Sequence, residues 1–275
     1  MTASADLRSI IEVLARQRGV DLSDQRPDTL ARGVGARLEK TRLDARAYCE
    51  RIEGDDGEVT RLIDAILVPA TTFFRDPPVW EALAAEVLPA LASGRSRPLR
   101  VWSAGCATGE EAWSIAMLLA EAFPPPWGFD VTGSDLHESS VETAMAARYP
   151  LAAVESIVSG PRVARFLESD GQSVRVVPAL RETARFEVHD LMGRALAPRA
   201  AVVASFDLVL LRNVLIYFDR RLQEKAIERV AGTIAPRGAL VLGPYEMLPG
   251  SAALSLRSWP GLPADLHVFR REQIA

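Results

Sequence analysis

The chain has 275 residues, of which 48% are hydrophobic and 25% are charged, and its formal net charge at pH 7 is -4. These proportions are typical of a folded globular protein and exclude a disordered chain or a peptide-sized scaffold. The acidic balance disfavours a protein that binds nucleic acid by covering phosphates with basic residues, unless such residues gather locally. We therefore expect no nucleic-acid partner.

Cysteine and histidine are too sparse to build a metal site or a disulfide framework. Cys49 and Cys106 show no CxxC or Cys/His spacing, and the three histidines do not cluster. Residues 1–22 mix charged with apolar side chains, which argues against a signal peptide. No stretch approaches the roughly 18 to 20 apolar residues that span a bilayer. We expect a cytoplasmic protein with neither a metal ion nor a membrane-inserted segment.

The first part of the chain, up to about residue 66, is predicted to be helical and shows no strand pattern. Its apolar residues recur at helical spacing, at Leu7, Ile10, Ile11, Leu14, Leu30, Val34 and Leu38. Between Arg26 and Arg46, six basic residues stand against three acidic ones, a local net charge of +3. On a helix, Arg32, Arg37 and Lys40 fall within about 140° of one another. This face is either an ordinary solvated surface or a contact surface for an acidic partner.

A change of pattern divides the chain into two predicted domains. The segment 67–80 contains three prolines, which interrupt helix, and from about residue 99 strands and helices alternate. We assign residues 1–70 to a helical N-terminal domain, with a linker that extends to about residue 78. Residues 71–275 form the second predicted domain.

The second domain is predicted to be an α/β sheet. Hydrophobic runs predict strands at 99–105, 129–135, 186–190, 206–212, 239–244 and 266–271, and helical periodicity predicts helices at 110–123, 139–149 and 220–234. Alternation of strand and helix is typical of a doubly wound sheet. Residues from about 150 to 185 break this alternation, and their short strand patterns predict a small inserted β-subdomain.

The turn after the first predicted strand has the composition of a ligand site. In S-A-G-C-A-T-G-E-E (103–111), Gly105 and Gly109 permit tight backbone geometry and the close approach of a ligand. The spacing differs from the phosphate-binding glycine motifs, no lysine follows, and Glu110 and Glu111 would repel a phosphate. A cationic or neutral ligand fits this turn better, although an acidic first helical turn is also a common structural feature.

Asp135 ends the second predicted strand, where an acidic side chain can accept hydrogen bonds from both hydroxyls of a ribose. The alternative is a helix cap, because Asp135 and Glu138 have the spacing of a capping box. A glycine turn after the first strand together with an acid after the second indicates a nucleoside ligand.

Five segments, taken together, are more specific than either pattern alone. They are T-T-F-F-R-D-P (71–77), W-S-A-G-C-A-T-G-E-E-A-W-S-I-A (102–116), G-S-D-L (133–136), F-D-L-V-L-L-R-N-V-L-I-Y-F-D (206–219) and A-P-R-G-A-L-V-L-G-P-Y-E (235–246). In this order they resemble the signature segments of the chemotaxis receptor methyltransferase family, the CheR type. The resemblance runs from the N-terminal helices almost to the end of the chain, and the R-N-V-L-I-Y-F-D segment is highly specific.

The resemblance implies a Rossmann-like class I methyltransferase sheet with helices on both faces, a small inserted antiparallel β-subdomain and an N-terminal all-α domain. It implies S-adenosylmethionine as the cofactor, S-adenosylhomocysteine as the product, and no metal. The implied activity is that of a protein-glutamate O-methyltransferase, which converts glutamate side chains of methyl-accepting chemotaxis receptors to glutamate 5-methyl esters. A glutamate with an ordinary pKa of about 4.3 needs no general base at neutral pH, which agrees with the absence of histidine from the five segments.

The resemblance also assigns residues to the site. By position, the cofactor contacts are Thr71, Arg75, Gly105, Glu111, Asp135, Asp190, Leu191, Arg212 and Asn213, and the residues lining the methyl-transfer site are Arg75 and Tyr217. Arg75 can hold a substrate carboxylate by two parallel hydrogen bonds or reach the carboxylate end of the cofactor, and these two roles stay open. Taken alone, Arg75 could pair with Asp76 at the surface, and Tyr217 could be a buried aromatic.

The implied partners are the cytoplasmic helices of chemoreceptors. They would dock on the basic helix through Arg32, Arg37 and Lys40, and we expect the chain to be a monomer. The segment 166–176, which would form the hairpin of the insertion, is short, and from this we expect no dependence on a receptor tether.

Three parts of the sequence depart from the family pattern. Pro69 and Asp190 stand where asparagine is common, and Pro244 to Glu246 replace a common H-S-E. These departures leave open a non-catalytic protein that senses S-adenosylmethionine or acts as a scaffold. A methyltransferase for another protein in a chemotaxis-like pathway, or for a small molecule, also stays open, although the basic helix argues against a small substrate.

Overall fold

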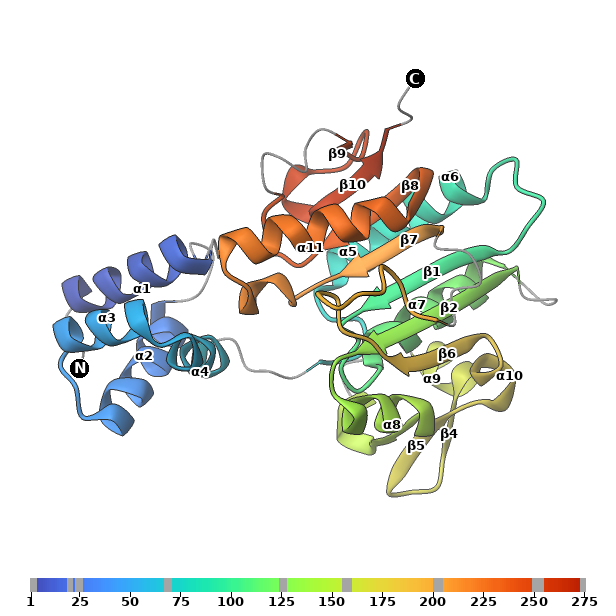
Figure 1. The fold of residues 1–275 in the computed structure, drawn as a ribbon. Coiled ribbons are helices and arrows are strands. Elements are labelled where there is room, and N and C mark those ends of the chain that lie inside the picture. Colours follow the sequence, from blue (N-terminus) through green and yellow to red (C-terminus); the bar gives the residue numbers. More distant parts are fainter. Residues whose placement is uncertain are drawn as a thin grey trace.

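In the computed structural model, helices form the N-terminal part of the chain and a mixed sheet flanked by helices forms the rest (Figure 1). The structure describes residues 4–18, 22, 27–66, 71–123, 128–154, 160–199, 205–248 and 255–272. The N-terminal helices lie to one side of the sheet. Pro69 and its neighbours in the predicted linker, residues 67–70, lie outside the described residues.

The N-terminal helices, which were predicted as an all-α domain, pack around a hydrophobic core that also includes Ile216 from the rest of the chain. They are α1 (Ser4–Arg18), α2 (Pro27–Thr41), α3 (Ala45–Gly54) and α4 (Asp56–Ile66). Leu14, Val34 and Tyr48, from three different helices, have no exposed surface in this core. Asp44 begins α3 by accepting a hydrogen bond from the Ala47 N–H at 2.8 Å. The apolar spacing seen in the sequence is therefore the packing surface of these helices.

A buried charge network joins α2, α3 and α4. The residue at its centre, Glu58 on α4, is 1% exposed. Its carboxylate accepts hydrogen bonds from Arg37 Nε at 2.9 Å, from the Tyr48 hydroxyl at 2.9 Å and from Arg61 Nε at 3.1 Å. Burial raises the pKa of Glu58, but these hydrogen bonds outweigh burial, so its pKa is lowered. The carboxylate therefore stays ionised and compensates the buried Arg37 guanidinium.

The position of Arg37 corrects the predicted basic contact surface. Arg37 is buried and pairs with Glu58, whereas Arg32 and Lys40 are exposed on α2. Helical spacing predicts that the three residues share one side of the helix, but it cannot show that Arg37 lies at the edge that packs on α4. A contact surface on α2 therefore excludes Arg37.

The main sheet has the strand order β6-β2-β1-β7-β8-β10-β9. Its strands are β1 (Leu99–Ala104), β2 (Phe129–Asp135), β6 (Ala184–Val188), β7 (Phe206–Leu211), β8 (Ile234–Leu242), β9 (Leu256–Ser258) and β10 (Val268–Arg271). The first five in the order pair in parallel, and β10 is antiparallel to both β8 and β9. The order of the strands reverses between β1 and β7, which is where doubly wound sheets bind ligands.

Helices cover both faces of this sheet. They are α5 (Pro77–Ala82), a π-helical turn (Leu83–Val87), α6 (Leu88–Ala92), α7 (Glu110–Ala122), α8 (Glu138–Ala146) and α11 (Arg220–Thr233). Leu208 and Leu210 on β7 belong to the core that contains α5 and α7, whereas Val209 and Leu211 belong to the core that contains α11. Because β7 is covered on both faces, all its residues are buried, and all are hydrophobic except Asp207, which pairs with Arg95 and Arg97.

The inserted subdomain contains a second, antiparallel sheet of order β3-β5-β4, which confirms the predicted small insertion. Its strands are β3 (Arg148–Pro150), β4 (Leu167–Ser169) and β5 (Ser173–Val176), and two short helices accompany them, α9 (Gly160–Phe166) and α10 (Pro178–Arg181). It lies at the end of the main sheet that is formed by β6 (Figure 1).

The helices and strands differ from the sequence prediction in several places, of which one helix end and two strands are the clearest. The helix predicted over 139–149 ends at Ala146, because Ala147 adopts a left-handed backbone conformation with φ of 51° and β3 follows. β8 begins at Ile234 rather than at residue 239. β9 was not predicted, because an edge strand this short leaves too few residues for a periodic pattern.

Replacing Glu58 with glutamine should destabilise the N-terminal helices by about 3 kcal/mol at pH 7, because the buried Arg37 guanidinium loses its compensating charge. Urea unfolding followed by circular dichroism measures this loss, and Glu39→Gln on the exposed face of α2 is the matched control. Equal unfolding midpoints for the two variants would contradict the network.

The pH dependence of the same variant has a defined sign. Because the pKa of Glu58 is lowered by folding, its pairs contribute stability above the unfolded-state pKa of about 4.3, and this contribution is lost as the pH falls through the lower folded-state pKa. The difference in stability between the native chain and Glu58→Gln should therefore shrink in acid.

Candidate functional site

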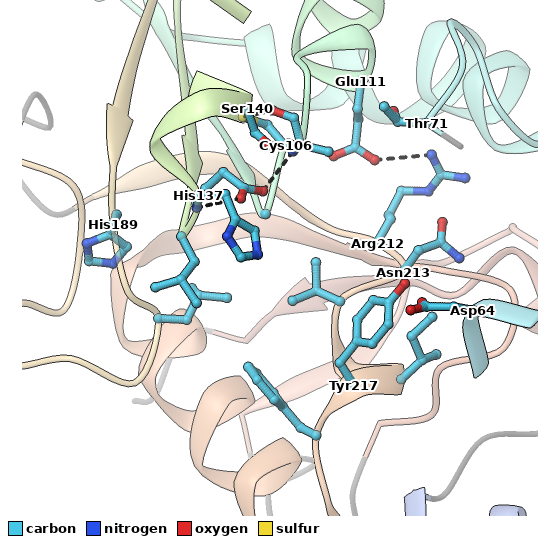
Figure 2. A pocket seen from close by; sticks show the side chains of 18 of the residues that line it. Asp64, Thr71, Cys106, Glu111, His137, Ser140, His189, Arg212, Asn213 and Tyr217 are labelled. Atoms are coloured by element: carbon cyan, nitrogen blue, oxygen red, sulfur yellow. Dashed lines mark hydrogen bonds and ion pairs between the residues drawn. The ribbon is translucent and has the colours of Figure 1, made fainter. Parts of the chain in front are cut away.

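A cavity of about 600 Å³ opens at the carboxyl ends of the central strands. All ten residues that the sequence assigned to the site line it, namely Thr71, Arg75, Gly105, Glu111, Asp135, Asp190, Leu191, Arg212, Asn213 and Tyr217. Thr60 and Asp64 from α4 line it as well, so the N-terminal helices contribute part of its wall. Figure 2 shows Glu111 and Arg212 facing each other, with Tyr217 beside Asp64 and Asn213.

The turn after β1 requires glycine at Gly105. Its φ of 76° lies in the left-handed region, and a Cβ atom there would lie 2.4 Å from Val214 Cγ2. The N–H groups of Gly105 and Cys106 both donate to the Ser134 carbonyl, at 2.8 and 2.9 Å. The turn thereby joins the ends of β1 and β2, and it brings backbone close to the cavity.

Asp135, at the end of β2, is positioned by backbone rather than by a helix cap. Its Oδ2 accepts from the Ala107 N–H at 2.9 Å and its Oδ1 from the His137 N–H at 3.0 Å. The capping residue of α8 is His137, so Asp135 and Glu138 do not form a capping box. Because each carboxylate oxygen has two lone pairs, Asp135 keeps acceptor capacity on the side of the cavity.

Arg212, directly after β7, joins three segments of the chain. Its guanidinium, with a side chain only 2% exposed, donates to Glu111 Oε2 at 3.3 Å and to Asp76 Oδ2 at 2.7 Å. It also donates to the Arg75 carbonyl at 3.1 Å. Ser103 Oγ holds the other oxygen of Glu111 at 2.8 Å. Burial raises the pKa of Glu111, and the Arg212 cation and the Ser103 hydroxyl oppose this rise.

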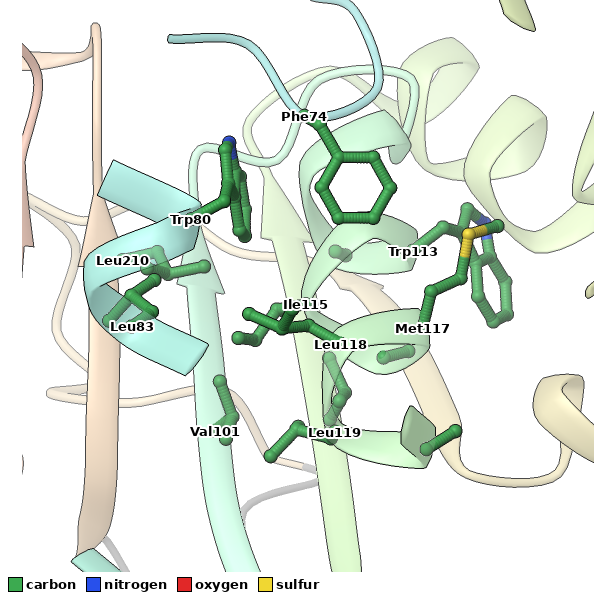
Figure 3. Close-up of a cluster of buried hydrophobic side chains, with 14 of the residues drawn as sticks. Phe74, Trp80, Leu83, Val101, Trp113, Ile115, Met117, Leu118, Leu119 and Leu210 are labelled. Carbon is green, nitrogen blue, oxygen red and sulfur yellow. The ribbon is translucent and has the colours of Figure 1, made fainter. Parts of the chain in front are cut away.

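The linker that carries Arg75 is fixed on the sheet domain. The Phe74 N–H donates to Ser114 Oγ at 2.9 Å, and the Phe74 and Trp80 rings pack edge to face with centroids 5.5 Å apart (Figure 3). Phe74 and Asp76 adopt left-handed backbone conformations with φ of 52° and 59°, an arrangement that costs free energy and persists only where surrounding contacts enforce it. Arg75 is therefore held at the cavity by its neighbours, and the predicted alternative of a simple surface pair with Asp76 is wrong because Asp76 pairs with Arg212.

Tyr217 ends a 3-10 turn (Leu215–Tyr217) and lies against the N-terminal helices. Burial raises its pKa to about 12, and the nearby Asp64 carboxylate adds to the rise while Arg75 opposes it. The hydroxyl is therefore protonated at physiological pH. Asp64 was missed from the sequence, because nothing in α4 distinguishes it from other exposed acids; only the packing of α4 on the 3-10 turn brings it to the cavity.

Glu246 is a second residue that the sequence did not assign to the site. It is 2% exposed. Its carboxylate accepts from the N–H groups of Gly243 at 2.6 Å, Asn213 at 2.9 Å, Val214 at 2.7 Å and Leu215 at 2.7 Å. Burial raises its pKa, and the four N–H donors oppose the rise. Glu246 thus holds the segment between β7 and Tyr217, including Asn213, whose φ of 60° is left-handed.

Asp190 and Leu191 follow β6 and line the cavity. Asp190 Oδ1 accepts from the Met192 N–H at 2.8 Å, which leaves the other oxygen of this exposed side chain available. The preceding His189 also lines the cavity, and its ring packs edge to face on Trp102 with centroids 5.8 Å apart. Burial lowers the pKa of His189, which favours the neutral imidazole.

The charges of the cavity define the ligand that it can hold. Glu111 and Asp135 present carboxylate oxygens, which suit hydroxyl groups or a positive centre, whereas Arg75 contributes a cation that affects the pKa of both Glu111 and Tyr217. A ligand with a ribose, a cationic centre and a carboxylate fits this pattern. Across the described ranges, no group of three or more His, Cys, Asp or Glu is placed to hold a metal ion. Among the helices that the structure describes, none has the length and apolar character needed to cross a membrane.

Comparison with known families gives two matches that together cover most of the chain. Residues 69–258 match the family described as "CheR methyltransferase, SAM binding domain", and residues 5–67 match "CheR methyltransferase, all-alpha domain". The first match includes the turn after β1, the end of β2 and the segment after β7, which form most of the cavity wall.

Three similar proteins illustrate the range of names. The chain is 34% identical over 238 residues to "Probable biofilm formation methyltransferase WspC" of Pseudomonas aeruginosa, covering 85% of this chain and 55% of that protein. It is 31% identical over 251 residues to "Chemotaxis protein methyltransferase 2" of the same organism, covering 88% of this chain and 86% of that protein. It is 33% identical over 248 residues to "Uncharacterized 104.1 kDa protein in hypE 3'region" of Rhodobacter capsulatus, covering 88% of this chain and 25% of that protein. The chain therefore spans about half of the first of these relatives and a quarter of the third.

Replacing Glu246 with glutamine should lower stability by about 3 kcal/mol, because the new side-chain amide cannot accept from all four N–H groups and leaves at least one of them buried without an acceptor. Thermal and urea unfolding measure the effect, with Glu224→Gln on the exposed face of α11 as the control. A Glu246→Gln variant as stable as that control would mean that the four hydrogen bonds do not hold this segment.

Proposed function

Because the chain belongs to the CheR methyltransferase family, we propose that it transfers a methyl group from S-adenosylmethionine to glutamate side-chain carboxylates of methyl-accepting chemotaxis receptors. The product on the receptor would be a glutamate 5-methyl ester. The observation that carries the proposal is the meeting of Arg75, Tyr217, Glu111 and Asp135 at one cavity. We also propose the division into a helical domain of residues 1–70 and a methyltransferase domain of residues 71–275, in a monomer located in the cytoplasm.

The cofactor would lie along the carboxyl ends of the strands. Asp135 would bind the ribose hydroxyls, Glu111 the positively charged or hydroxyl-bearing part, and the segment of Asp190 and Leu191 the remaining end. When bound, S-adenosylmethionine supplies an electrophilic methyl group on a sulfonium centre. The left-handed turn at Gly105 would let the backbone approach such a ligand, and a side chain at this position would collide with Val214 and distort the turn.

The substrate would enter between the linker and the N-terminal helices. The Arg75 guanidinium can hold a carboxylate by two parallel hydrogen bonds and so orient the oxygen that reacts. A glutamate with a pKa of about 4.3 is already ionised, so the site needs no base to activate it. The Tyr217 hydroxyl, protonated at neutral pH, can donate to the same carboxylate or accept from a neighbour. Arg75 and Tyr217 would both act by aligning the carboxylate in a site shielded from water. Such a site suits this reaction, because the positive charge of the sulfonium and the negative charge of the carboxylate cancel as the methyl group is transferred.

Docking of a receptor helix would use the exposed part of α2. Arg32 and Lys40 are exposed there, while Arg37 is occupied by Glu58 and is excluded from the proposal. Chemotaxis methyltransferases among the relatives support a receptor-related partner in general terms. The turn between β4 and β5 is short, so independence from a receptor tether stays a prediction.

A second candidate function is methylation of another protein in a chemotaxis-like pathway. The likeness to a protein named a biofilm formation methyltransferase favours it, since the chain is 34% identical to that relative. The geometry of the cavity would be the same for both substrates, because each would present an acidic side chain to Arg75. A non-catalytic sensor or scaffold receives less support, because Arg75 and Tyr217 both line the cavity.

The activity is tested by incubating the purified chain with tritiated S-adenosylmethionine and cytoplasmic fragments of chemoreceptors. The expected product is a base-labile methyl label on the fragment. Arg75→Lys should lower kcat/KM by about 100-fold, because one ammonium cannot replace two parallel hydrogen bonds, and Tyr217→Phe should lower it by about tenfold.

Arg221→Lys, on the exposed face of α11, is the matched control and should leave the rate unchanged. Absence of label on every acidic helical substrate, despite cofactor binding, would reject the proposed activity and favour the sensor. Label on a fragment from another signalling protein, but not on receptors, would favour the second candidate.

Reversal of charge on α2 tests the docking surface. The double variant Arg32→Glu with Lys40→Glu should raise KM for the receptor fragment by about tenfold at low salt and leave kcat unchanged, because rim charges steer association. Lys225→Glu on α11 is the control, since it changes a similarly exposed charge away from α2. A double variant with the KM of the native chain would exclude this surface.

A further inference from the structure

One side chain on α11 holds the segment that closes the cofactor side of the cavity. Arg229 Nε donates to the Leu191 carbonyl at 2.7 Å, and its Nη2 donates to the carbonyls of Gly193 at 2.6 Å and Ala195 at 2.7 Å. These three acceptors belong to the segment 190–197, which follows β6 and carries Asp190 and Leu191 into the cavity wall.

Leu191, Met192 and Ala197 of this segment pack against the core that contains α11, but few hydrogen bonds fix its backbone. It contains turns and bends but no helix or strand, and its own hydrogen bonds close one turn, from the Gly193 N–H to the Asp190 carbonyl at 2.9 Å and from the Met192 N–H to Asp190 Oδ1 at 2.8 Å. A backbone held by so few contacts loses much conformational freedom when it is ordered. Arg229 therefore supplies the hydrogen-bonded tie between the carbonyl groups of this segment and a rigid element.

The chemistry of the tie requires arginine. A guanidinium presents its donors in a planar fork and remains charged, so it can hold three carbonyl oxygens at once in a fixed geometry. Lysine would offer a single ammonium at the end of a flexible stem and could not reproduce three contacts that approach from different positions along the segment. The charged donor also makes each of these hydrogen bonds stronger than a neutral one.

The same helix holds another part of the cavity wall through a different residue. Gln223 Nε2 donates to the carbonyls of Leu215 at 2.9 Å and Phe218 at 3.0 Å, which flank Tyr217, and it also contacts the Arg18 carbonyl at the end of α1. α11 thus positions the segment after β6 and the turn after β7 independently. Loss of Arg229 should disturb the segment after β6 and leave the turn after β7 in place.

We infer that Arg229 is a positioning residue for cofactor binding, which it supports by ordering the segment 190–197 before the ligand arrives. The inference rests on the proposed function, because it takes S-adenosylmethionine as the ligand of this wall. Arg229 acts through carbonyl oxygens of the segment, so its removal should weaken cofactor binding while the methyl-transfer groups Arg75 and Tyr217 keep their places.

The test uses the intact chain and two variants, Arg229→Gln and Arg229→Lys, with Arg221→Gln on the exposed face of the same helix as the control. Calorimetric titration with S-adenosylhomocysteine should give a Kd that rises about tenfold in Arg229→Gln, by a smaller factor in Arg229→Lys and not at all in the control. With S-adenosylmethionine, KM for the cofactor should rise in the same proportion, and kcat at saturating cofactor should stay within about twofold.

The outcomes separate this inference from the proposed function. If the native chain binds no S-adenosylhomocysteine, the proposed function fails. If it binds and a folded Arg229→Gln binds equally well, or loses kcat with KM unchanged, the inference alone is wrong. A lower melting temperature with an unchanged Kd would likewise overturn it, because that result describes a purely structural contact. If Arg229→Gln does not fold, the same criteria apply to Arg229→Lys.

Discussion

The buried guanidinium of Arg212 is the interaction on which the rest of the site depends. A cation with a side chain only 2% exposed must be paired, and its partners Glu111 and Asp76 come from α7 and from the linker. These pairs bring the end of β7, the start of α7 and the linker to one point. The linker can then present Arg75 to the cavity, although two of its residues must adopt strained backbone conformations to do so.

A common principle governs the remaining walls, since side chains outside the cavity hold the backbone of the segments that line it. Glu246 accepts from the segment after β7, and Gln223 and Arg229 donate to carbonyls on either side from one helix. These backbone N–H and carbonyl groups of the cavity wall are thus hydrogen-bonded to side chains of the protein itself. Asp135 keeps acceptor capacity for a ligand, and so a rigid frame surrounds a small number of available charges.

Much of the sheet domain could be predicted from the sequence, because β7 is covered on both faces and such buried strands are almost entirely apolar. The residues that line the cavity were predicted from their likeness to family segments, and their individual roles stay proposals. Other features depend on tertiary packing and could not be predicted. Arg37 looks like a surface charge until α4 places Glu58 beside it, and Asp64 becomes part of the cavity wall only because α4 packs near Tyr217. Glu246 shows no pattern in sequence that would distinguish a buried acceptor of backbone N–H groups from an exposed acid.

The central claim is that this cavity binds the nucleoside cofactor of a methyltransferase, with Asp135 on the ribose. Calorimetric titration with S-adenosylhomocysteine tests it most directly, for the native chain, for Asp135→Ala and for Asp130→Ala, which removes an exposed acid from the same strand. The native chain and Asp130→Ala should bind the ligand, and Asp135→Ala should have a Kd at least about tenfold higher, since a hydrogen bond to a charged acceptor is worth roughly 1.5–3 kcal/mol. No binding to the native chain, or equal affinity in all three, would contradict it.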